Sequence, residues 1–194
     1  MEKILSSAII ILIAMSSCKK ERDTSVGTQE PKMQHIQLMD AEVAQGGAKF
    51  FDLNNDGRRD FGFKTTLVGD PLLQRDRLLF EVFSGIGSFL LNNEHEETPP
   101  LRAGDEIGNI HLGFEWHEIS TLVLTEKHMY NSGEIGWDGI WKTANHRYLA
   151  IRLKENNRVY FGWIELSFDK VGEKIILHRA ALCREANREI KAGI

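Results

Sequence analysis

The feature that most constrains this chain is a series of short apolar or alternating runs separated by Gly, Asn and Asp, with no window that carries a helical stripe over three turns. Runs of this length and period are typical of β-strands, and turn residues at short intervals indicate antiparallel sheets. The expected strands cover residues 35–39, 48–53, 61–67, 78–84, 107–114, 119–125, 147–154, 158–168 and 174–183. The pattern therefore predicts an all-β fold, either an antiparallel β-sandwich or a jelly roll, in place of alternating strands and helices.

The most detailed structural prediction concerns residues 147–168. Asn156-Asn157 suits a two-residue hairpin turn because Asn accepts a positive φ, and this turn fixes the register of the strands beside it. One face then holds Leu149, Ile151, Leu153, Tyr160, Gly162 and Ile164, and the other holds Tyr148, Ala150, Arg152, Phe161, Trp163 and Glu165. We expect the first face to be buried and the second to tolerate a change at Glu165.

The first twenty residues resemble an export signal. Lys3 precedes an apolar stretch, residues 4–15, which is shorter than the ~20 apolar residues of a membrane-spanning helix but has the length of a signal-peptide core. Met15-Ser16-Ser17-Cys18 follows, with Lys19-Lys20 behind it. This arrangement resembles the lipobox of bacterial lipoproteins, which implies cleavage before Cys18 and lipidation of its thiol. An uncleaved anchor helix and a buried N-terminal helix are the alternatives.

That resemblance implies a domain organisation and a location. Residues 1–17 would be the signal peptide, residues 18–34 the lipidated cysteine and a flexible tether, and residues 35–194 the β-sandwich domain. The tether prediction agrees with the polar composition of residues 19–33, which offer almost nothing to bury. The implied location is the cell envelope, with the lipid in a membrane, the outer membrane being the one expected. With Cys18 lipidated, Cys183 has no partner for a disulfide and is expected to be a buried free thiol.

The charge balance excludes one class of partner. The chain has 24 Lys and Arg residues against 28 Asp and Glu residues, a formal net charge of −4. Binding to phosphate backbones without sequence preference draws its affinity from a surplus of basic side chains. We therefore expect no nucleic-acid partner.

One segment carries the spacing of a calcium loop. Residues 50–61 read FFDLNNDGRRDF, with oxygen-bearing side chains at loop positions one, three, five and nine, a glycine at six and a main-chain carbonyl available at seven. Ca²⁺ takes six to eight oxygen ligands, and this spacing wraps them around one point. The predicted metal residues are Asp52, Asn54, Asp56, Arg58 through its carbonyl, and Asp60.

This loop resembles the D-x-[DN]-x-D-G calcium loops of EF-hands, dockerins and integrin-type β-propeller repeats. It departs from the EF-hand at the twelfth position, where Phe63 stands in place of a bidentate acid. Because strands flank the loop, we expect it at the tip of a β-hairpin, with the ion in a structural role. The alternative is a plain turn, since Asp-Gly between β-runs is a turn signal without any ion.

Aromatic residues suggest a second kind of site. Trp137, Trp141 and Trp163, together with Trp116, could offer flat faces to sugar rings, with Asp138 or Glu165 accepting hydrogen bonds from hydroxyl groups. Burial in the core explains the same aromatic residues without a ligand.

A family resemblance covers about half of the expected mature chain. Residues 137–141 (WDGIW), 147–153 (RYLAIRL), 159–166 (VYFGWIEL) and 190–193 (IKAG) are similar to the C-terminal region of uncharacterised secreted bacterial β-proteins. The resemblance implies a β fold and an extracytoplasmic compartment, and it implies no activity.

The functional expectation is a non-catalytic, lipid-anchored envelope protein with a calcium-stabilised β-domain that binds a glycan or another envelope protein. No nucleophile motif, cofactor loop or catalytic-metal spacing is present. The alternative is a glycoside hydrolase or lyase on a lectin-like sandwich, with acids such as Glu115, Glu118 or Glu165 in a groove.

Overall fold

The computed structural model describes residues 29–194, and this part of the chain is built from strands without a helix. The larger sheet is antiparallel, with strand order β1-β12-β11-β10-β5-β7. Its strands are β1 (Met33–Val43), β5 (Ser88–Asn92), β7 (Glu115–Glu118), β10 (Arg147–Glu155), β11 (Arg158–Asp169) and β12 (Lys174–Cys183).

The second sheet has strand order β2-β3-β4-β8-β9. Its strands are β2 (Ala48–Phe51), β3 (Phe61–Asp70), β4 (Arg75–Ser84), β8 (Thr121–Tyr130) and β9 (Ile135–Asp138). A short pair joins β6 (Glu106–Ile107) to β13 (Ile190–Lys191).

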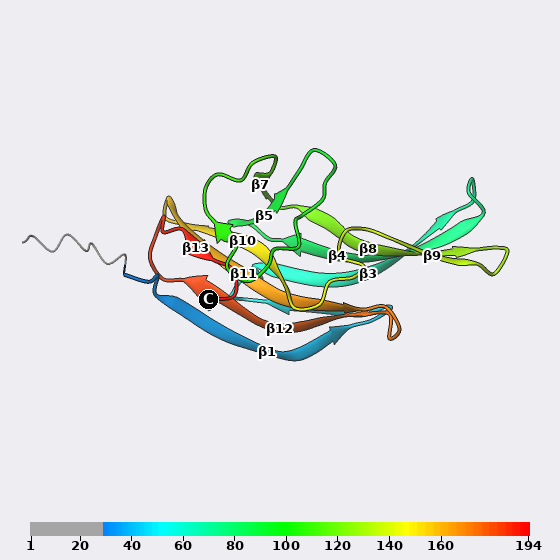
Figure 1. The fold of residues 1–194 in the computed structure, drawn as a ribbon, viewed down its shortest axis with the longest axis horizontal. Helices are drawn as coiled ribbons and strands as arrows, with labels where there is room; N and C mark the ends of the chain where they lie inside the picture. The colour runs from blue at the N-terminus through cyan, green and yellow to red at the C-terminus, as the bar shows by residue number, and fades with distance from the viewer. Residues whose placement is uncertain (1–28) are drawn as a thin grey trace, which may run out of the picture.

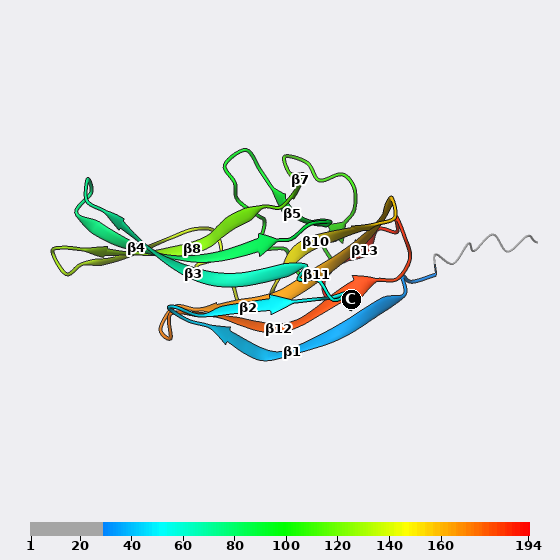
Figure 2. The same ribbon diagram turned by 180° about the vertical axis from the view of Figure 1, so that it is seen from behind.

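The two large sheets pack face to face, as Figures 1 and 2 show from opposite sides. The core between them combines aromatic residues of β3 and β4, such as Phe63 and Phe80, with aliphatic residues of β10 and β11, such as Leu149 and Ile164. The prediction of an all-β, antiparallel β-sandwich is confirmed.

The predicted hairpin register is also confirmed. Leu153 pairs with Tyr160, Ile151 with Gly162, and Leu149 with Ile164. Asn156 and Asn157 both have positive φ values, 47° and 61°, as a two-residue turn that follows the twist of its strands requires.

The expectation for the second face of this hairpin is wrong, because that face is covered too. Phe161 and Trp163 are 0% exposed and belong to a second core cluster. Leu101 and Ile107 from the long β5–β7 connection, together with Ile190 near the C-terminus, pack over them. The larger sheet is therefore buried on both faces along β10 and β11.

Several strand boundaries differ from the predictions. The expected strand at 107–114 shrinks to β6, and the turns after it leave Ile110 and Leu112 89% and 98% exposed. The apolar run Phe89-Leu90-Leu91 forms β5, which pairs with β10. The first strand begins at Met33, two residues earlier than the expected domain boundary.

Two hairpins extend beyond the body of the sandwich. β3–β4 and β8–β9 project at the end opposite to the point where residue 29 enters (Figure 1). The main-chain N–H of Asn131 donates to the carbonyl of Gln74 at 3.0 Å, which joins the two tips. Leu72 is 92% exposed there, and Leu73 and Ile135 are exposed as well. We call residues 67–78 and 127–137 the arm.

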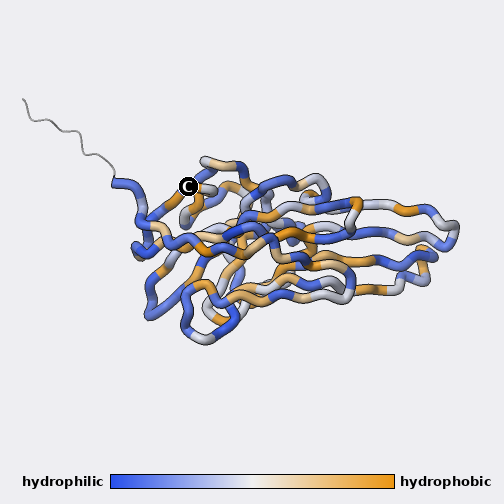
Figure 3. The backbone as a smooth tube through the Cα atoms, turned by 90° about the horizontal axis from the view of Figure 1, so that it is seen from below, coloured by the Kyte–Doolittle hydropathy of each residue, from blue (hydrophilic) through white to orange (hydrophobic). Residues whose placement is uncertain are grey.

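The entry end of the domain is polar. In Figure 3 the segment that enters from the grey trace is hydrophilic, whereas hydrophobic positions lie along the strands of the body. Cys18 and the predicted signal peptide lie outside the described residues. Cys183 is a buried free thiol, as expected, and burial raises its pKa. Within residues 29–194 no helix is suited to crossing a membrane.

Candidate functional site

The predicted calcium residues lie together in the loop between β2 and β3. Asp52 accepts hydrogen bonds from the main-chain N–H groups of Asp56 at 3.1 Å and Gly57 at 2.8 Å. Asn54 Oδ1 accepts from Asp56 N–H at 3.1 Å. Asp56 Oδ1 in turn accepts from Arg58 N–H at 2.8 Å. These bonds hold the side-chain oxygens of positions one, three and five around the loop's own main chain.

Asp60, at the ninth position, is the buried member of the set, with 4% exposure. Its Oδ2 accepts from Leu53 N–H at 2.7 Å, and its Oδ1 lies 3.4 Å from the hydroxyl of Ser88. Burial is the main cause that raises the pKa of Asp60, and the nearby charges of Asp56 and Asp52 raise it further. The site therefore disfavours its own negative charge when no cation is bound.

Within residues 29–194, the negative charge of the Asp52, Asp56 and Asp60 carboxylates is not neutralised by a Lys or Arg side chain. The Arg59 guanidinium lies over the Phe50 ring, 4.3 Å from its centroid. In the described part of the chain, no Lys or Arg forms an ion pair with Asp52, Asp56 or Asp60.

The loop borders a depression of about 680 Å³ between it and the β10–β11 turn. Glu155, from the end of β10, accepts a hydrogen bond from Asn54 Nδ2 at 2.5 Å. Phe63, at the twelfth loop position, is a fully buried core residue. The chain thus places a carboxylate from a different strand beside the loop, which no local spacing in the sequence indicates. The residue types suit Ca²⁺, but the carboxylates of Asp52, Asp56, Asp60 and Glu155 do not supply three ligand atoms within 4.8 Å of one another.

The tryptophan hypothesis is corrected by burial. Trp141 and Trp163 are 1% and 0% exposed, so neither has a face available for a sugar ring. Trp141 Nε1 donates to the carbonyl of Thr98 at 2.8 Å. Trp137 is half-buried against the core, with its ring 5.2 Å from Phe168. These residues belong to the packing of the sandwich.

Glu165 is likewise unsuited to contacting a ligand, since it is 5% exposed. Its Oε2 accepts from Arg179 Nε at 2.5 Å, and its Oε1 lies 2.7 Å from His146 Nδ1. Burial acts to raise the pKa of Glu165, but the bonds to Arg179 and His146 outweigh it and hold the pKa below its ordinary range.

The acids named for glycoside hydrolysis do not form a pair. β7, which carries Glu115 and Glu118, is three strands away from β11 and Glu165. At ~4.8 Å between neighbouring strands this is about 14 Å, beyond the ~5–9.5 Å that such a pair needs. Glu115 and Glu118 are three residues apart in one strand, so they point to opposite faces.

A different group of titratable residues meets on β8 and β9. Among residues 29–194, Glu126, His128 and Asp138 are the one His/Cys/Asp/Glu trio whose ligand atoms lie within 4.8 Å of one another. Arg77 already pairs with Glu126, and Lys142 lies 3.7 Å from Asp138. Because these cations already balance both carboxylates, the trio does not require a metal.

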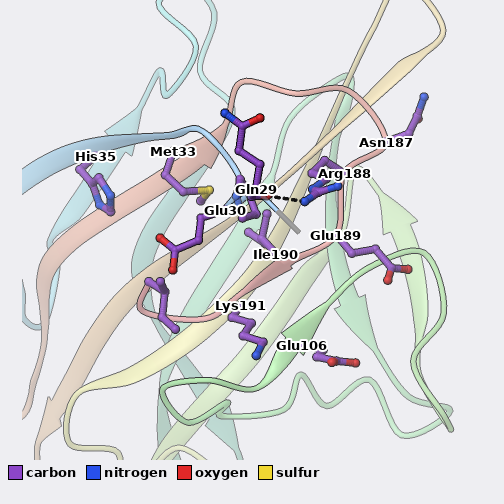
Figure 4. Close-up of a pocket in the computed structure, with 12 residues that line it drawn as sticks. Gln29, Glu30, Met33, His35, Glu106, Asn187, Arg188, Glu189, Ile190 and Lys191 are labelled. Carbon is purple, nitrogen blue, oxygen red and sulfur yellow. Dashed lines mark hydrogen bonds between the residues drawn. The ribbon is translucent and has the colours of Figure 1, made fainter. Parts of the chain in front are cut away.

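A cavity lies at the entry end, and Figure 4 shows the residues that line it. It measures about 950 Å³ and is lined by residues of both termini of the described chain, including Met33, Ile190 and Lys191. Arg188 Nη2 donates to the carbonyl of Gln29 at 2.6 Å across it. The side chains that line this cavity include acidic, basic and apolar groups, and none of the predicted site residues is among them.

Comparisons with protein-family models, with curated proteins and with solved structures find no match for this chain.

Proposed function

We propose that this protein is a lipid-anchored protein of the cell envelope whose calcium-stabilised β-domain binds another envelope protein. The observation that carries the proposal is the placement of the entry point and of the exposed apolar arm at opposite ends of the domain (Figure 1). An anchor at Cys18 would then hold the entry end toward the membrane, and the arm would point away from it.

The arm has the properties of a protein contact. Leu72, Leu73 and Ile135 are exposed at its tips, and β9 is an edge strand with one unpaired side. Exposed apolar side chains grouped at one end of a domain are typical of interaction surfaces, and an edge strand can extend a partner's sheet. The burial of Trp141 and Trp163 removes the main support for a glycan, so a protein partner is the better fit.

The calcium part of the proposal is supported by the loop between β2 and β3. Asp52, Asn54, Asp56 and Asp60 supply oxygens from a closed turn, and no protein cation offsets their charge within the described residues. A bound Ca²⁺ would join this loop to the β10–β11 end of the other sheet, where Glu155 already contacts Asn54. Its role would be structural.

Calcium is expected to raise the melting temperature of the full chain. At ~10 mM Ca²⁺ over a site with a dissociation constant of ~0.1 mM, binding to the folded state alone adds about 2.7 kcal/mol. For a domain of this size that is about 5–10 °C. Asp56→Ala should abolish the increase. Differential scanning calorimetry with Ca²⁺ or EDTA measures it.

The matched control is Asp105→Ala. Asp105 also accepts a main-chain N–H, from Arg102 at 2.7 Å, but it lies in an unrelated turn, so its variant should keep the calcium response. The raised pKa of Asp60 adds a pH signature. Without Ca²⁺, the stability of the domain should fall as pH rises from the ordinary Asp pKa through the pKa of Asp60 in the folded state. The rise in melting temperature on adding Ca²⁺ should therefore be larger at pH 7 than at pH 4. An identical melting curve in Ca²⁺ and EDTA would reduce the loop to a plain turn.

Anchoring and binding are tested together by fractionating and cross-linking cells. The wild type should remain with membranes and form a cross-linked complex. Cys18→Ser should leave the membrane fraction or stay unprocessed. The double variant Leu72→Asp/Leu73→Asp should remain at the membrane, melt like the wild type and lose the complex, because both side chains are exposed.

Val171→Asp is the control for the arm, since Val171 is 96% exposed in the β11–β12 turn and lies outside it. Retention of the complex by the arm variant would contradict the binding part of the proposal. Membrane fractionation of Cys18→Ser at the mature size would contradict the anchoring part.

A further inference from the structure

Three neighbouring strands of the larger sheet depart from regular pairing at the same level. β1 pairs Gln37 with Arg179 and then Ala41 with Leu177, so residues 38–40 form a bulge. β11 pairs Glu165 with Arg179 and then Leu166 with Leu177, which leaves His178 as an extra residue in β12. Bulges of this kind redirect side chains and are over-represented beside active sites.

The backbone at this level is also strained. Met39 and Asp40 have φ values of 58° and 52°, and His146, which precedes β10, has 47°. None of these is a glycine, and non-glycine residues in the left-handed region gather at functional sites. The consequence of the β1 bulge is that Asp40 lies beside His178.

The redirected side chains form one hydrogen-bonded chain. Asp40 Oδ1 lies 2.6 Å from His178 Nδ1, and His178 Nε2 lies 2.8 Å from Ser167 Oγ. A carboxylate at Nδ1 fixes the tautomer in which Nδ1 carries the proton, so Nε2 is free to accept the serine hydroxyl. Nucleophile, base and orienting acid thus stand in the relation of a Ser-His-Asp triad.

A second contact directs the serine hydroxyl. The main-chain N–H of His146 donates to Ser167 Oγ at 2.9 Å, which occupies a lone pair and leaves the hydroxyl proton to be donated. Asn145 Oδ1, a second possible acceptor for the hydroxyl proton, lies 3.5 Å from Ser167 Oγ, farther than His178 Nε2 at 2.8 Å. The hydroxyl proton therefore has His178 as its closest acceptor.

The surroundings of His178 come from the strands and the turn packed against it. The ring of His146 stacks on it at 4.2 Å with an interplanar angle of 17°. His146 itself contacts Glu165, which is paired with Arg179. The groups that can influence the protonation of His178 are therefore Asp40, His146, Glu165 and Arg179.

We propose that Ser167, His178 and Asp40 form a catalytic triad that hydrolyses small carboxylic esters. The inference adds an activity to a domain that the sequence pattern predicts to be non-catalytic, and it depends on neither the anchor nor calcium. Asp40 and His146 are open to solvent, with side chains 74% and 59% exposed. Ser167 is 8% exposed, which restricts the acyl group to a small one such as acetyl.

The reaction balances with water as the only co-reactant. Ser167 Oγ attacks the ester carbonyl carbon while its proton passes to His178 Nε2, and Asp40 stabilises the resulting imidazolium. The tetrahedral intermediate expels the alkoxide, which leaves as the alcohol with that proton. Water then attacks the carbonyl carbon of the acyl-serine while His178 takes a proton from the water. The carboxylic acid leaves as His178 returns that proton to Ser167 Oγ.

The test uses the full chain purified in detergent, with a fluorophosphonate as covalent probe and p-nitrophenyl acetate as substrate. Mass spectrometry should locate the fluorophosphonate on Ser167 of the wild type, a result that requires no variant. Ser167→Ala should lose labelling. His178→Gln should lower kcat/KM for the ester by roughly 10²–10⁴-fold.

Ser84→Ala is the matched control. Ser84 is also a buried strand serine that accepts a main-chain N–H, from Ser120 at 2.9 Å, but among residues 29–194 no imidazole hydrogen-bonds to it. Its variant should keep labelling and turnover, and melting curves establish that all variants fold. A wild type that stays unlabelled, or that is labelled at another residue, overturns the proposal. Equal turnover in Ser167→Ala and the wild type also overturns it, since exposed histidines alone can then account for the hydrolysis.

Discussion

Glu165→Lys is expected to destabilise the domain by about 3 kcal/mol, because removing one partner of a buried ion pair leaves the other charge uncompensated. Glu165 is 5% exposed and both of its oxygens are engaged, by Arg179 and by His146. The introduced Lys would add a second cation beside Arg179. The figure is at the lower end of the range for buried pairs because the Arg179 side chain is 37% exposed.

Urea unfolding of Glu165→Lys, Ile164→Asp and Arg158→Glu shows whether the outer face of β11 is buried at Glu165 or open to solvent. Ile164→Asp places a charge in the core between the sheets and should also unfold the domain. Arg158 is exposed at the start of the same strand, so its variant should stay within ~0.5 kcal/mol of the wild type. The pKa of Glu165 is lowered in the folded protein, so its ionised form contributes fully to the stability of the domain above the ordinary Glu pKa. This contribution is lost as pH falls through the pKa of the folded state. If Glu165→Lys unfolds like Arg158→Glu, the outer face is not closed.

The contrast between Ile164 and Glu165 shows which features of β11 the sequence predicts and which it does not. The register of β10 and β11 follows from a local turn, Asn156-Asn157, and from alternation within a dozen residues on either side. The covering of the second face depends on Leu101, Ile107 and Ile190, which arrive from segments that look polar and loop-like. Burial by a distant, mixed-polarity segment leaves no periodic signal in the strand that it covers.

The same distinction holds for the sites. The loop from Asp52 to Asp60 is contiguous, so its spacing alone predicts the side-chain to main-chain hydrogen bonds that close it. Asp40 and His178 are 138 residues apart, and they meet because β1 and β12 carry extra residues at the same level. Alternation predicts regular pairing and therefore misses an extra residue, which is why the histidines appear scattered in the sequence.

Trp141→Ala is expected to have the largest effect on the core, a loss of about 3–5 kcal/mol. The indole is 1% exposed and belongs to the cluster between the sheets, so its removal leaves a cavity that the packed strands cannot close. Its Nε1 also donates to the carbonyl of Thr98, itself a buried residue, and that acceptor would lose its partner. The melting temperature should fall by about 6–20 °C.

The loss should also loosen a particular segment, because the bond to Thr98 holds the connection between β5 and β6 against the core. A Glu-specific protease should cut Trp141→Ala near Glu94 and Glu96, which are exposed, faster than it cuts the wild type. Trp137→Ala is the comparison, since its half-buried ring has no such bond in the described chain and should leave that segment protected. A Trp141→Ala protein that melts like the wild type, yet loses retention on a glycan gel, would show that the indole serves a ligand and that the core does not depend on it.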